Sequence, residues 1–195
     1  MRRDVLDKGY VELVESMGGD YSVVRNARKC YRSSSEDPEK NMRLILQLID
    51  SGHMTPFESI VITYDVKCPL FIARQWMRHR IGSYNEESLR YCEAEPEFWA
   101  PKDQEWMLDD AMNQFTKYNA LIKTGTIPEQ ARAILPMSLY TKFYWTVNGS
   151  SLINFLRLRT HKAAQQEIRE YAKAVLELAC HTAPTTFGYI VGECL

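Results

Sequence analysis

Apolar and polar residues alternate in two stretches of the chain, residues 59–66 and residues 139–147. The apolar set of the first stretch is Ile60, Ile62, Tyr64 and Val66, and the matching set of the second is Thr141, Phe143, Trp145 and Val147. A period of two residues is typical of a strand with one buried face, so we predict two core strands. Residues 5–15 alternate less regularly and are predicted to form a further strand or an extended arm.

Other segments repeat apolar residues at the spacing of a helix. The predicted helices cover residues 20–30, 38–50, 69–78, 103–123, 127–130, 150–159 and 164–179. Asp20 or Ser22 is predicted to cap the first of them, and Gly52 follows the second, as glycine commonly does at a helix C-terminus. Asn148 and Gly149 are predicted to form the turn that opens the 150–159 helix.

The order of these elements predicts the fold class. Strands and helices are mixed without a regular alternation of strand, helix and parallel strand. We therefore expect an α+β fold with a small antiparallel sheet packed against several helices. The 195 residues suit a single domain, 1–195, and can bury a core without metals or disulfides.

Charge is distributed unevenly along a chain whose formal net charge is only -1. Arg74, Arg78, Arg80 and Arg90 are crowded together with His79 in one short segment. Because the planar fork of arginine suits phosphate groups, this segment predicts a local anion site. Clustered arginines and aromatic residues also allow an alternative hypothesis, a nucleic-acid-binding module. The pI of about 6.4 and the lack of an extended basic stripe argue against it.

Several other classes of site lack their sequence signals. No glycine-rich dinucleotide or P-loop motif follows a strand, so any bound phosphates must be held by side chains and helix N-termini. The 4 histidines are separated, so no metal site is expected. The 5 scattered cysteines are expected to be reduced and mostly buried. We expect a cytoplasmic protein, because no signal peptide or membrane-spanning apolar run is evident.

One motif connects these observations. Arg78, His79 and Arg80 are followed after a predicted loop, 81–87, by Ser88 and then by an Arg-Tyr pair. This pattern resembles the signature of the flavin-dependent thymidylate synthases. Further segments resemble that family in the same order along the chain: 52–58, 73–76, 131–136, 140–148, 154–159 and 165–168.

The resemblance implies a reaction and an assembly. The reaction is the reductive methylation of dUMP to dTMP. Methylenetetrahydrofolate would donate the one-carbon unit, FAD would carry the hydride and NADPH would reduce the flavin. The resemblance also implies a homotetramer whose active sites are shared between subunits.

The same resemblance implies roles for individual residues. The FAD-binding set is Arg78, His79, Arg80, Glu86, Asn148, Gly149, Ser150 and Asn154, with His53 and Thr55 supplied by a neighbouring subunit. The dUMP-binding set is Gln75, Arg78, Glu86, Glu87, Ser88, Leu89, Arg90 and Arg159, with Arg132 supplied by another subunit. Arg159 is the predicted catalytic residue, because its position in the family lies against the uracil ring and would favour the deprotonated ring nitrogen.

Ser88 is assigned to substrate binding, because no histidine adjoins it in sequence to activate it as a nucleophile. Three residues depart from the family pattern: Cys30 replaces a frequent serine, Leu89 a frequent glycine and Ala163 a frequent histidine. A third hypothesis is a thiol-dependent methyltransferase, which predicts inactivation when one cysteine is alkylated.

Overall fold

The computed structural model describes residues 1–194 and has a five-stranded antiparallel sheet at its centre, with the strand order β1-β2-β3-β5-β4. The strands are β1 Arg2–Val5, β2 Gly9–Met17, β3 Val61–Pro69, β4 Ser83–Glu86 and β5 Tyr140–Asn148. The helices are α1 Asp20–Lys29, α2 Pro38–Asp50, α3 Leu70–Trp76, α4 Trp106–Lys123, α5 Pro128–Ala131, α6 Gly149–Thr160, α7 Gln166–Thr182 and α8 Pro184–Cys194, with short 3₁₀ turns η1 Thr55–Ser59 and η2 Arg132–Ile134. The predicted α+β class is confirmed.

Strands β3 and β5 form the centre of the sheet, and both were predicted from their alternation. Tyr64 lies opposite Trp145 in the antiparallel register, and their rings stack with centroids 5.8 Å apart. Trp76 of α3 packs edge-on against Trp145 at 5.3 Å. All three side chains are fully buried, and burial of each contributes roughly 1.5–3 kcal/mol. This packing fixes the end of α3, where the arginine-rich motif begins.

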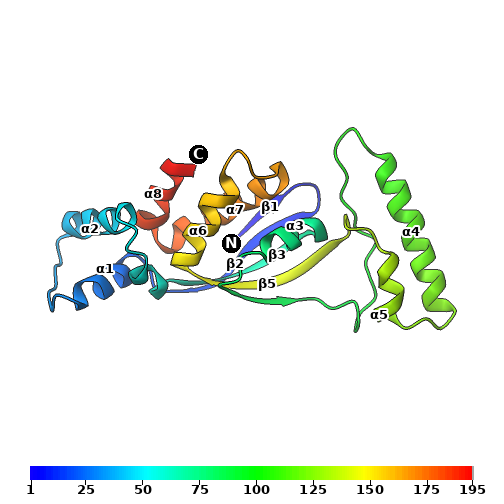
Figure 1. Cartoon of the computed structure of the whole chain (residues 1–195), viewed down its shortest axis with the longest axis horizontal. Helices are drawn as coiled ribbons and strands as arrows, with labels where there is room; N and C mark the ends of the chain where they lie inside the picture. Colours follow the sequence, from blue (N-terminus) through cyan, green and yellow to red (C-terminus); the bar gives the residue numbers. More distant parts are fainter. Residues whose placement is uncertain (195) are drawn as a thin grey trace.

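The helices α3, α6 and α7 lie on the same side of the sheet (Figure 1). Helix α7 packs on β1, β2, α3 and α6, and its apolar face joins the main hydrophobic core. Helices α1 and α2 lie toward one end of the molecule, whereas α4 and α5 lie at the other end. Residues of α1 or α2 are therefore far from residues of α4 or α5 in the same chain.

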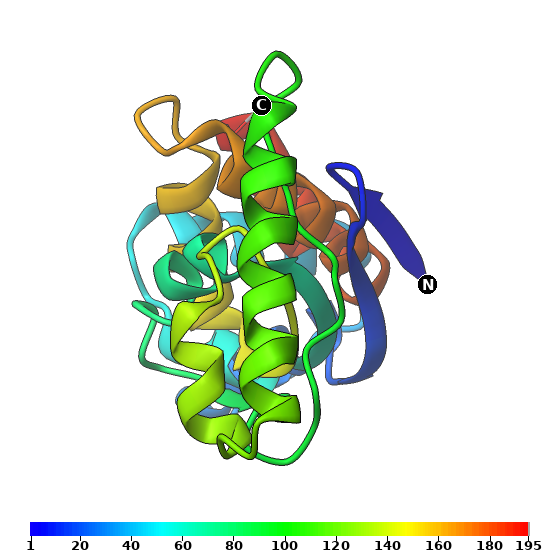
Figure 2. The ribbon, with the colours of Figure 1, turned by 90° about the vertical axis from the view of Figure 1, so that its right-hand side faces the viewer.

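A second, smaller hydrophobic cluster lies beneath α4 and α5, which run side by side (Figure 2). Its fully or nearly fully buried members include Phe98, Tyr118, Ala131 and Leu139. Leu139 directly precedes β5, so the cluster is tied to the central sheet. Leu89, one of the predicted substrate-binding residues, packs its side chain against this cluster.

Three local predictions were wrong in detail. Residues 83–86 form strand β4 instead of a loop, with Asn85 opposite Tyr144 of β5. Residues 5–15, predicted as one strand or an extended arm, belong to a hairpin of two strands, β1 and β2. Helix α3 ends at Trp76, so the arginine motif lies just beyond the helix. β4 is a short edge strand with mostly polar residues, and its pairing depends on β5, which is distant in sequence.

The predicted cap of α1 was also wrong. Gly19 occupies the N-cap position, and the carboxylate of Asp20 instead binds the start of α8. It accepts hydrogen bonds from the backbone N–H of Thr185 at 2.7 Å and from the backbone N–H and hydroxyl of Thr186 at 2.9 and 2.7 Å. Helix α8, which was not predicted, thus receives its capping carboxylate from a residue far away in sequence.

Cys30, Cys68, Cys92 and Cys180 are free thiols, as expected, but their predicted burial is only partly correct. Cys68 is buried and Cys180 is partly buried, whereas Cys30 and Cys92 are exposed. Cys30 directly follows α1, and Cys92 lies in the irregular segment between β4 and α4. None of the helices described in residues 1–194 is long and apolar enough to cross a membrane.

Gly18 joins β2 to α1 in a backbone conformation that residues with a side chain rarely adopt. Its φ angle is 81°, and a Cβ atom built there would lie 2.3 Å from the carbonyl oxygen of Ser59. We expect Gly18→Ala to lower the free energy of unfolding by about 2–4 kcal/mol, since it combines an unfavourable φ with a backbone clash. Gly125 also has a positive φ but open space around it, so Gly125→Ala is expected to cost only about 1 kcal/mol. Urea unfolding of both variants measures the difference, and equal losses would contradict the predicted clash.

Candidate active site

The arginine motif lies in a turn that strand β4 holds in place. Arg78 and Arg80 are exposed, and His79 between them is half-buried. The hydroxyl of Tyr84 on β4 donates to the carbonyl oxygen of His79 at 2.7 Å. Gly82 lies so close to the sheet that a Cβ atom there would be 2.9 Å from Nε1 of Trp145. The position of the motif therefore depends on the pairing of β4 with β5.

Arg159, at the end of α6, contacts this motif directly. Its Nε donates to Nε2 of His79 at 2.9 Å, and its Nη2 donates to the carbonyl oxygen of Gln75 at 2.9 Å. Because Nε2 of His79 accepts a hydrogen bond, its ring is neutral with the proton on Nδ1. The structure thus brings together three predicted site residues from α3, the turn that follows it and α6.

Burial, together with the positive charge of Arg159, lowers the pKa of His79 to about 4. Burial also lowers the pKa of Arg159, which nevertheless stays cationic because a guanidinium does not deprotonate in proteins. At neutral pH the cluster therefore combines one fixed cation with one neutral imidazole.

This electrostatic arrangement predicts a titration. The folded-state pKa of His79 lies below the usual value of 6.5, so the unfolded state binds more protons between about pH 4 and pH 6.5. The contribution of His79 to stability is fully present above pH 6.5 and is lost as the pH falls toward 4. NMR of protein carrying ¹³C-labelled histidine should show His79 neutral at pH 6. In Arg159→Met the pKa of His79 should rise, and an unchanged pKa would contradict the proposed coupling; His79→Gln assigns the signal.

Gln75 is held from a second side. Its Nε2 donates to Oε1 of Gln165 at 2.6 Å, and Gln165 occupies the N-cap position of α7. No specific sequence signal marks this role, although Gln165 lies in a segment that resembles the family. The start of α7 therefore helps to position the side chain of a predicted dUMP-binding residue.

Glu86 and Glu87 lie at the end of β4 beside an open pocket of about 320 Å³, which is lined in part by Asp65, Lys142 and Tyr144. The hydroxyl of Thr141 donates to Oε1 of Glu86 at 2.7 Å. Thr141 is almost fully buried, so it orients the exposed carboxylate from within the sheet. Its contribution was missed because the strand pattern indicated only a core residue.

Arg90 and Arg132 both contact Glu129, which lies on α5. Nε of Arg90 donates to the Glu129 carboxylate at 2.9 Å, and Nε of Arg132 donates to the Glu129 carbonyl oxygen at 3.3 Å. Both arginines are exposed. The Ser88 hydroxyl oxygen lies 3.4 Å from the backbone nitrogen of Arg90, from which it accepts a hydrogen bond. One chain therefore brings the two arginines near the same carboxylate-bearing residue.

The start of α6 packs against the 3₁₀ turn η1. The backbone N–H of Gly149 donates to the carbonyl oxygen of Ile60 at 2.8 Å, and a Cβ atom at Gly149 would lie 2.6 Å from the Phe57 carbonyl oxygen. Oδ1 of Asn148 caps the helix by accepting from the Ser151 backbone N–H at 2.8 Å. The predicted residues Thr55, Gly149 and Ser150 thus belong to neighbouring segments.

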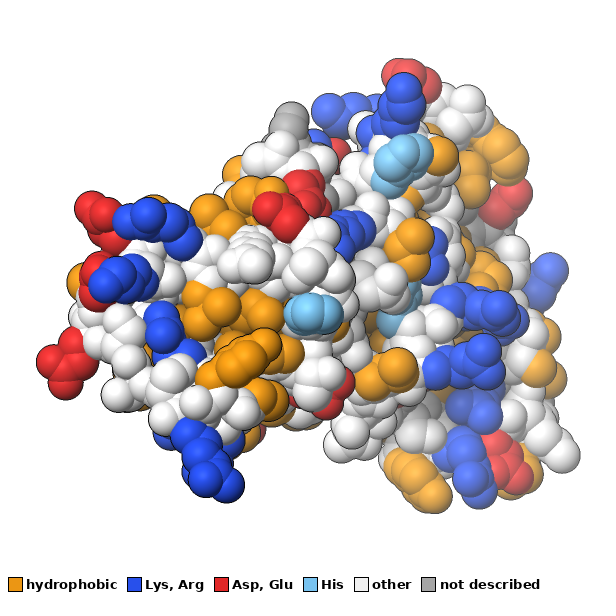
Figure 3. All heavy atoms as spheres, turned by 60° about the vertical axis from the view of Figure 1, so that its left-hand side comes forward, with side chains coloured by type: hydrophobic (Ala, Val, Ile, Leu, Met, Phe, Trp, Pro, Cys, Tyr) orange, Lys and Arg blue, Asp and Glu red, His pale blue; other side chains and the backbone are white. Residues whose placement is uncertain are grey.

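The predicted residues do not all meet within one chain. His53 follows α2, at one end of the long axis, whereas Arg132 follows α5 at the other end (Figure 1). His53 and Thr55 are exposed, as is Asn154 on α6. A space-filling view of one face shows Lys and Arg side chains gathered on its right-hand part, next to histidine (Figure 3). This basic surface is open to an anionic ligand.

Comparison with known proteins identifies the family. Residues 12–185 match the family model described as thymidylate synthase complementing protein. Flavin-dependent thymidylate synthases from Thermosipho africanus and Thermotoga neapolitana are each 44% identical to this chain, covering 96% of it and 92% and 93% of their own lengths. The chain belongs to the flavin-dependent thymidylate synthase family.

A solved structure supports the same conclusion. The UMP/dUMP methylase PolB from Streptomyces cacaoi, bound with 5-Br dUMP, has 29% sequence identity and a TM-score of 0.88, with 97% of each chain covered. The resemblance stated from the sequence is therefore confirmed for the family and for the fold. The individual roles of the site residues stay predictions.

FAD is the cofactor of the flavin-dependent thymidylate synthase family, and the donors in this chain suit it. FAD presents a diphosphate and a polar ring edge, which guanidinium, hydroxyl and amide groups can bind. Here these groups are Arg78 and Arg80 beside the turn, and Ser150 and Asn154 on α6. Among the described residues, no group of three or more His, Cys, Asp or Glu side chains could hold a metal ion.

Proposed function

We propose that this protein converts dUMP to dTMP by reductive methylation, with methylenetetrahydrofolate as one-carbon donor, FAD as hydride carrier and NADPH as reductant. The observation that carries the proposal is the contact of Arg159 with His79 and Gln75, inside a motif shared with the family. Bound FAD would supply the redox chemistry, which no amino-acid side chain provides.

Arg159 is the proposed catalytic residue. Within residues 1–194, two of its five N–H groups donate to His79 and to the Gln75 carbonyl oxygen, which leaves three for a substrate. Because its neighbour His79 is neutral at pH 7, the guanidinium is the only charge within this pair. A fixed cation beside the uracil ring would stabilise negative charge on the ring nitrogen, and such preorganised charge is a large catalytic term.

The dUMP site is proposed at the end of β4 and the segment that follows it. Arg90 would bind the phosphate, with Ser88 and the backbone at Leu89 beside it, while Glu86 and Glu87 would face the sugar and base. Glu86 is already oriented by Thr141. The side chain of Leu89 packs into the second hydrophobic cluster, which leaves its backbone to contact the ligand.

The cofactor site is proposed to need more than one chain. FAD would contact Arg78, His79 and Arg80 of one subunit, while His53 and Thr55 would come from a neighbour, as the family resemblance implies. We propose a homotetramer with shared active sites, located in the cytoplasm. Light scattering on the purified protein would test the assembly: a stable monomer that retains activity would contradict it.

An absorption spectrum tests the cofactor. The purified protein, supplemented with FAD, should be yellow and should bleach on anaerobic addition of NADPH, with a further spectral change when dUMP is added. Arg43→Met, an exposed arginine on α2, provides a control that should behave as the unaltered protein. A protein that stays colourless with FAD would contradict the proposal.

Ser88 separates this mechanism from one that uses a serine nucleophile. We expect Ser88→Ala to retain measurable turnover and to raise the KM for dUMP by about three- to tenfold, the loss of one hydrogen bond. Steady-state kinetics with varied dUMP measures both parameters. Complete loss of turnover with unchanged dUMP binding would contradict the assignment of Ser88 to substrate binding.

A further inference from the structure

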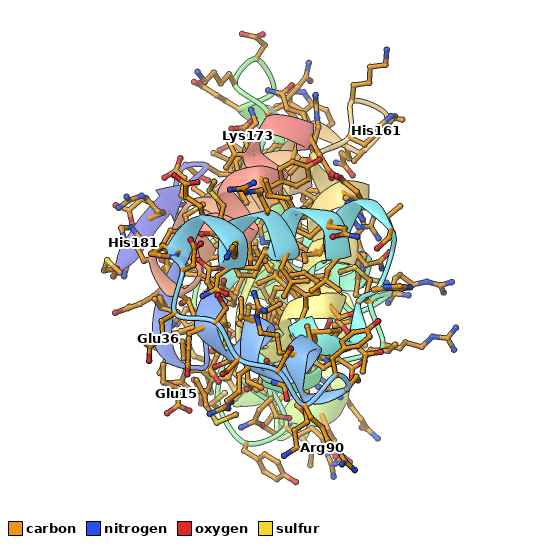
Figure 4. All side chains as sticks on the ribbon, turned by 90° about the vertical axis from the view of Figure 1, so that its left-hand side faces the viewer. Glu15, Glu36, Arg90, His161, Lys173 and His181 are labelled. Carbon is orange, nitrogen blue, oxygen red and sulfur yellow. The ribbon has the colours of Figure 1, made fainter. Side chains whose placement is uncertain are left out.

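A second basic pocket lies on the other side of α6, away from the proposed active site. It has a volume of about 470 Å³ and is formed by the end of α6, the loop that follows, α7 and α8. Its cationic or titratable lining residues are Arg157, His161, Lys162, Arg169 and Lys173. The loop residue His161 and Lys173 both lie at the upper end of the molecule in Figure 4, whereas Arg90 lies at the lower end.

The geometry of α6 separates this pocket from Arg159. Successive residues of an α-helix are rotated by about 100°, so Arg157 and Arg159 point to nearly opposite sides. Arg159 faces His79, whereas Arg157 faces Glu193 of α8 with contacts of 2.7 and 2.9 Å. The pocket is therefore distinct from the site assigned to dUMP and FAD.

The positive charge of the pocket is only partly balanced. Glu193 pairs with Arg157, and Glu170 lies 3.5 Å from Lys173. Within residues 1–194, no carboxylate lies within ion-pairing distance of Lys162 or Arg169. In addition, Nε of Arg169 is buried and has no hydrogen-bond partner among the described residues. A buried guanidinium N–H without an acceptor is costly, so this group calls for an anionic partner.

We propose that this pocket binds the phosphate group of a small phosphorylated ligand. Arginine forks and lysine ammonium groups, which both line this pocket, suit phosphate oxygens. The volume exceeds that of a single phosphate and lies in the range of small-molecule sites. The pocket is independent of the proposed dUMP reaction.

Calorimetric titration with pyrophosphate tests this site. The protein is first saturated with FAD and dUMP, so that their phosphates occupy the arginines of the proposed active site, and ionic strength is held constant with KCl. We expect one pyrophosphate per chain to bind. Arg169→Met should weaken it at least tenfold, as expected for loss of charge-assisted hydrogen bonds, whereas Arg43→Met should leave it unchanged.

Two further variants keep the test decisive if Arg169→Met does not fold. Lys162→Met alters an exposed side chain and should also weaken binding. Glu193→Gln should strengthen it, because the competing carboxylate is removed. Absence of pyrophosphate binding, or equal binding by Arg169→Met or Lys162→Met and the unaltered protein, would overturn the proposal. Succinate bound as tightly as pyrophosphate would overturn the preference for phosphate.

Discussion

Replacing Arg159 with methionine is expected to lower kcat for dTMP formation by about a hundredfold to a thousandfold, the usual effect of removing one preorganised electrostatic group. The reason is local. Arg159 supplies the positive charge beside a neutral His79, and its two bonds to His79 and Gln75 fix its direction. Methionine keeps a similar stem but removes both bonds and the charge. Single-turnover kinetics, with the flavin already reduced, measures the chemical step.

The matched control is Arg159→Lys. Lysine keeps the charge but lacks the planar fork, so it cannot make both bonds in the same geometry. Its kcat is expected between those of Arg159→Met and the unaltered protein. Flavin absorbance should be retained in both variants, which separates a catalytic effect from loss of cofactor. A kcat for Arg159→Met within threefold of the unaltered protein would contradict a catalytic role.

Arg90→Met should raise the KM for dUMP by about tenfold to a hundredfold, with a smaller effect on kcat. Arg90 is exposed and its guanidinium pairs with the Glu129 carboxylate, with which the substrate phosphate would compete. Losing it removes charge-assisted hydrogen bonds to the phosphate, which is remote from the reacting carbon. Titration of dUMP in steady-state assays measures the effect.

Glu129→Gln provides the companion variant for Arg90. It removes the competing carboxylate but leaves the guanidinium in place, so the KM for dUMP should stay within a few-fold of the normal value or fall. Deoxyuridine, which lacks the phosphate, should bind equally to Arg90→Met and to the unaltered protein. If Arg90→Met weakened both ligands equally, the assignment of Arg90 to the phosphate would be wrong.

The parts of the fold that were predicted from the sequence depend on local patterns. The alternation at Tyr64 and Val66, and again at Phe143 and Trp145, reports burial on one face of β3 and β5, and the structure has these side chains buried. The arginine motif could be located for the same reason, because its spacing is local. Its resemblance to the family was sufficient to predict the cofactor, whereas the fold class was predicted from the order of strands and helices.

The parts that were missed depend on contacts between distant residues. Strand β4 has a single large apolar residue, Tyr84, and exists because β5 pairs with it. Helix α8 begins where Asp20 supplies its cap. The contacts of Thr141 with Glu86 and of Glu129 with Arg90 likewise join segments far apart in sequence. No local period marks such pairs, so only the three-dimensional arrangement shows them.

The most direct test of the proposed function is product formation from a labelled one-carbon donor. The purified protein is incubated anaerobically with dUMP, NADPH, FAD and methylenetetrahydrofolate carrying ¹³C in the methylene group, and the nucleotides are analysed by mass spectrometry. We predict dTMP with ¹³C in its methyl group, formed only when both FAD and NADPH are present. A flavin-loaded protein that yields no dTMP, or dTMP formed equally without flavin, would contradict the account.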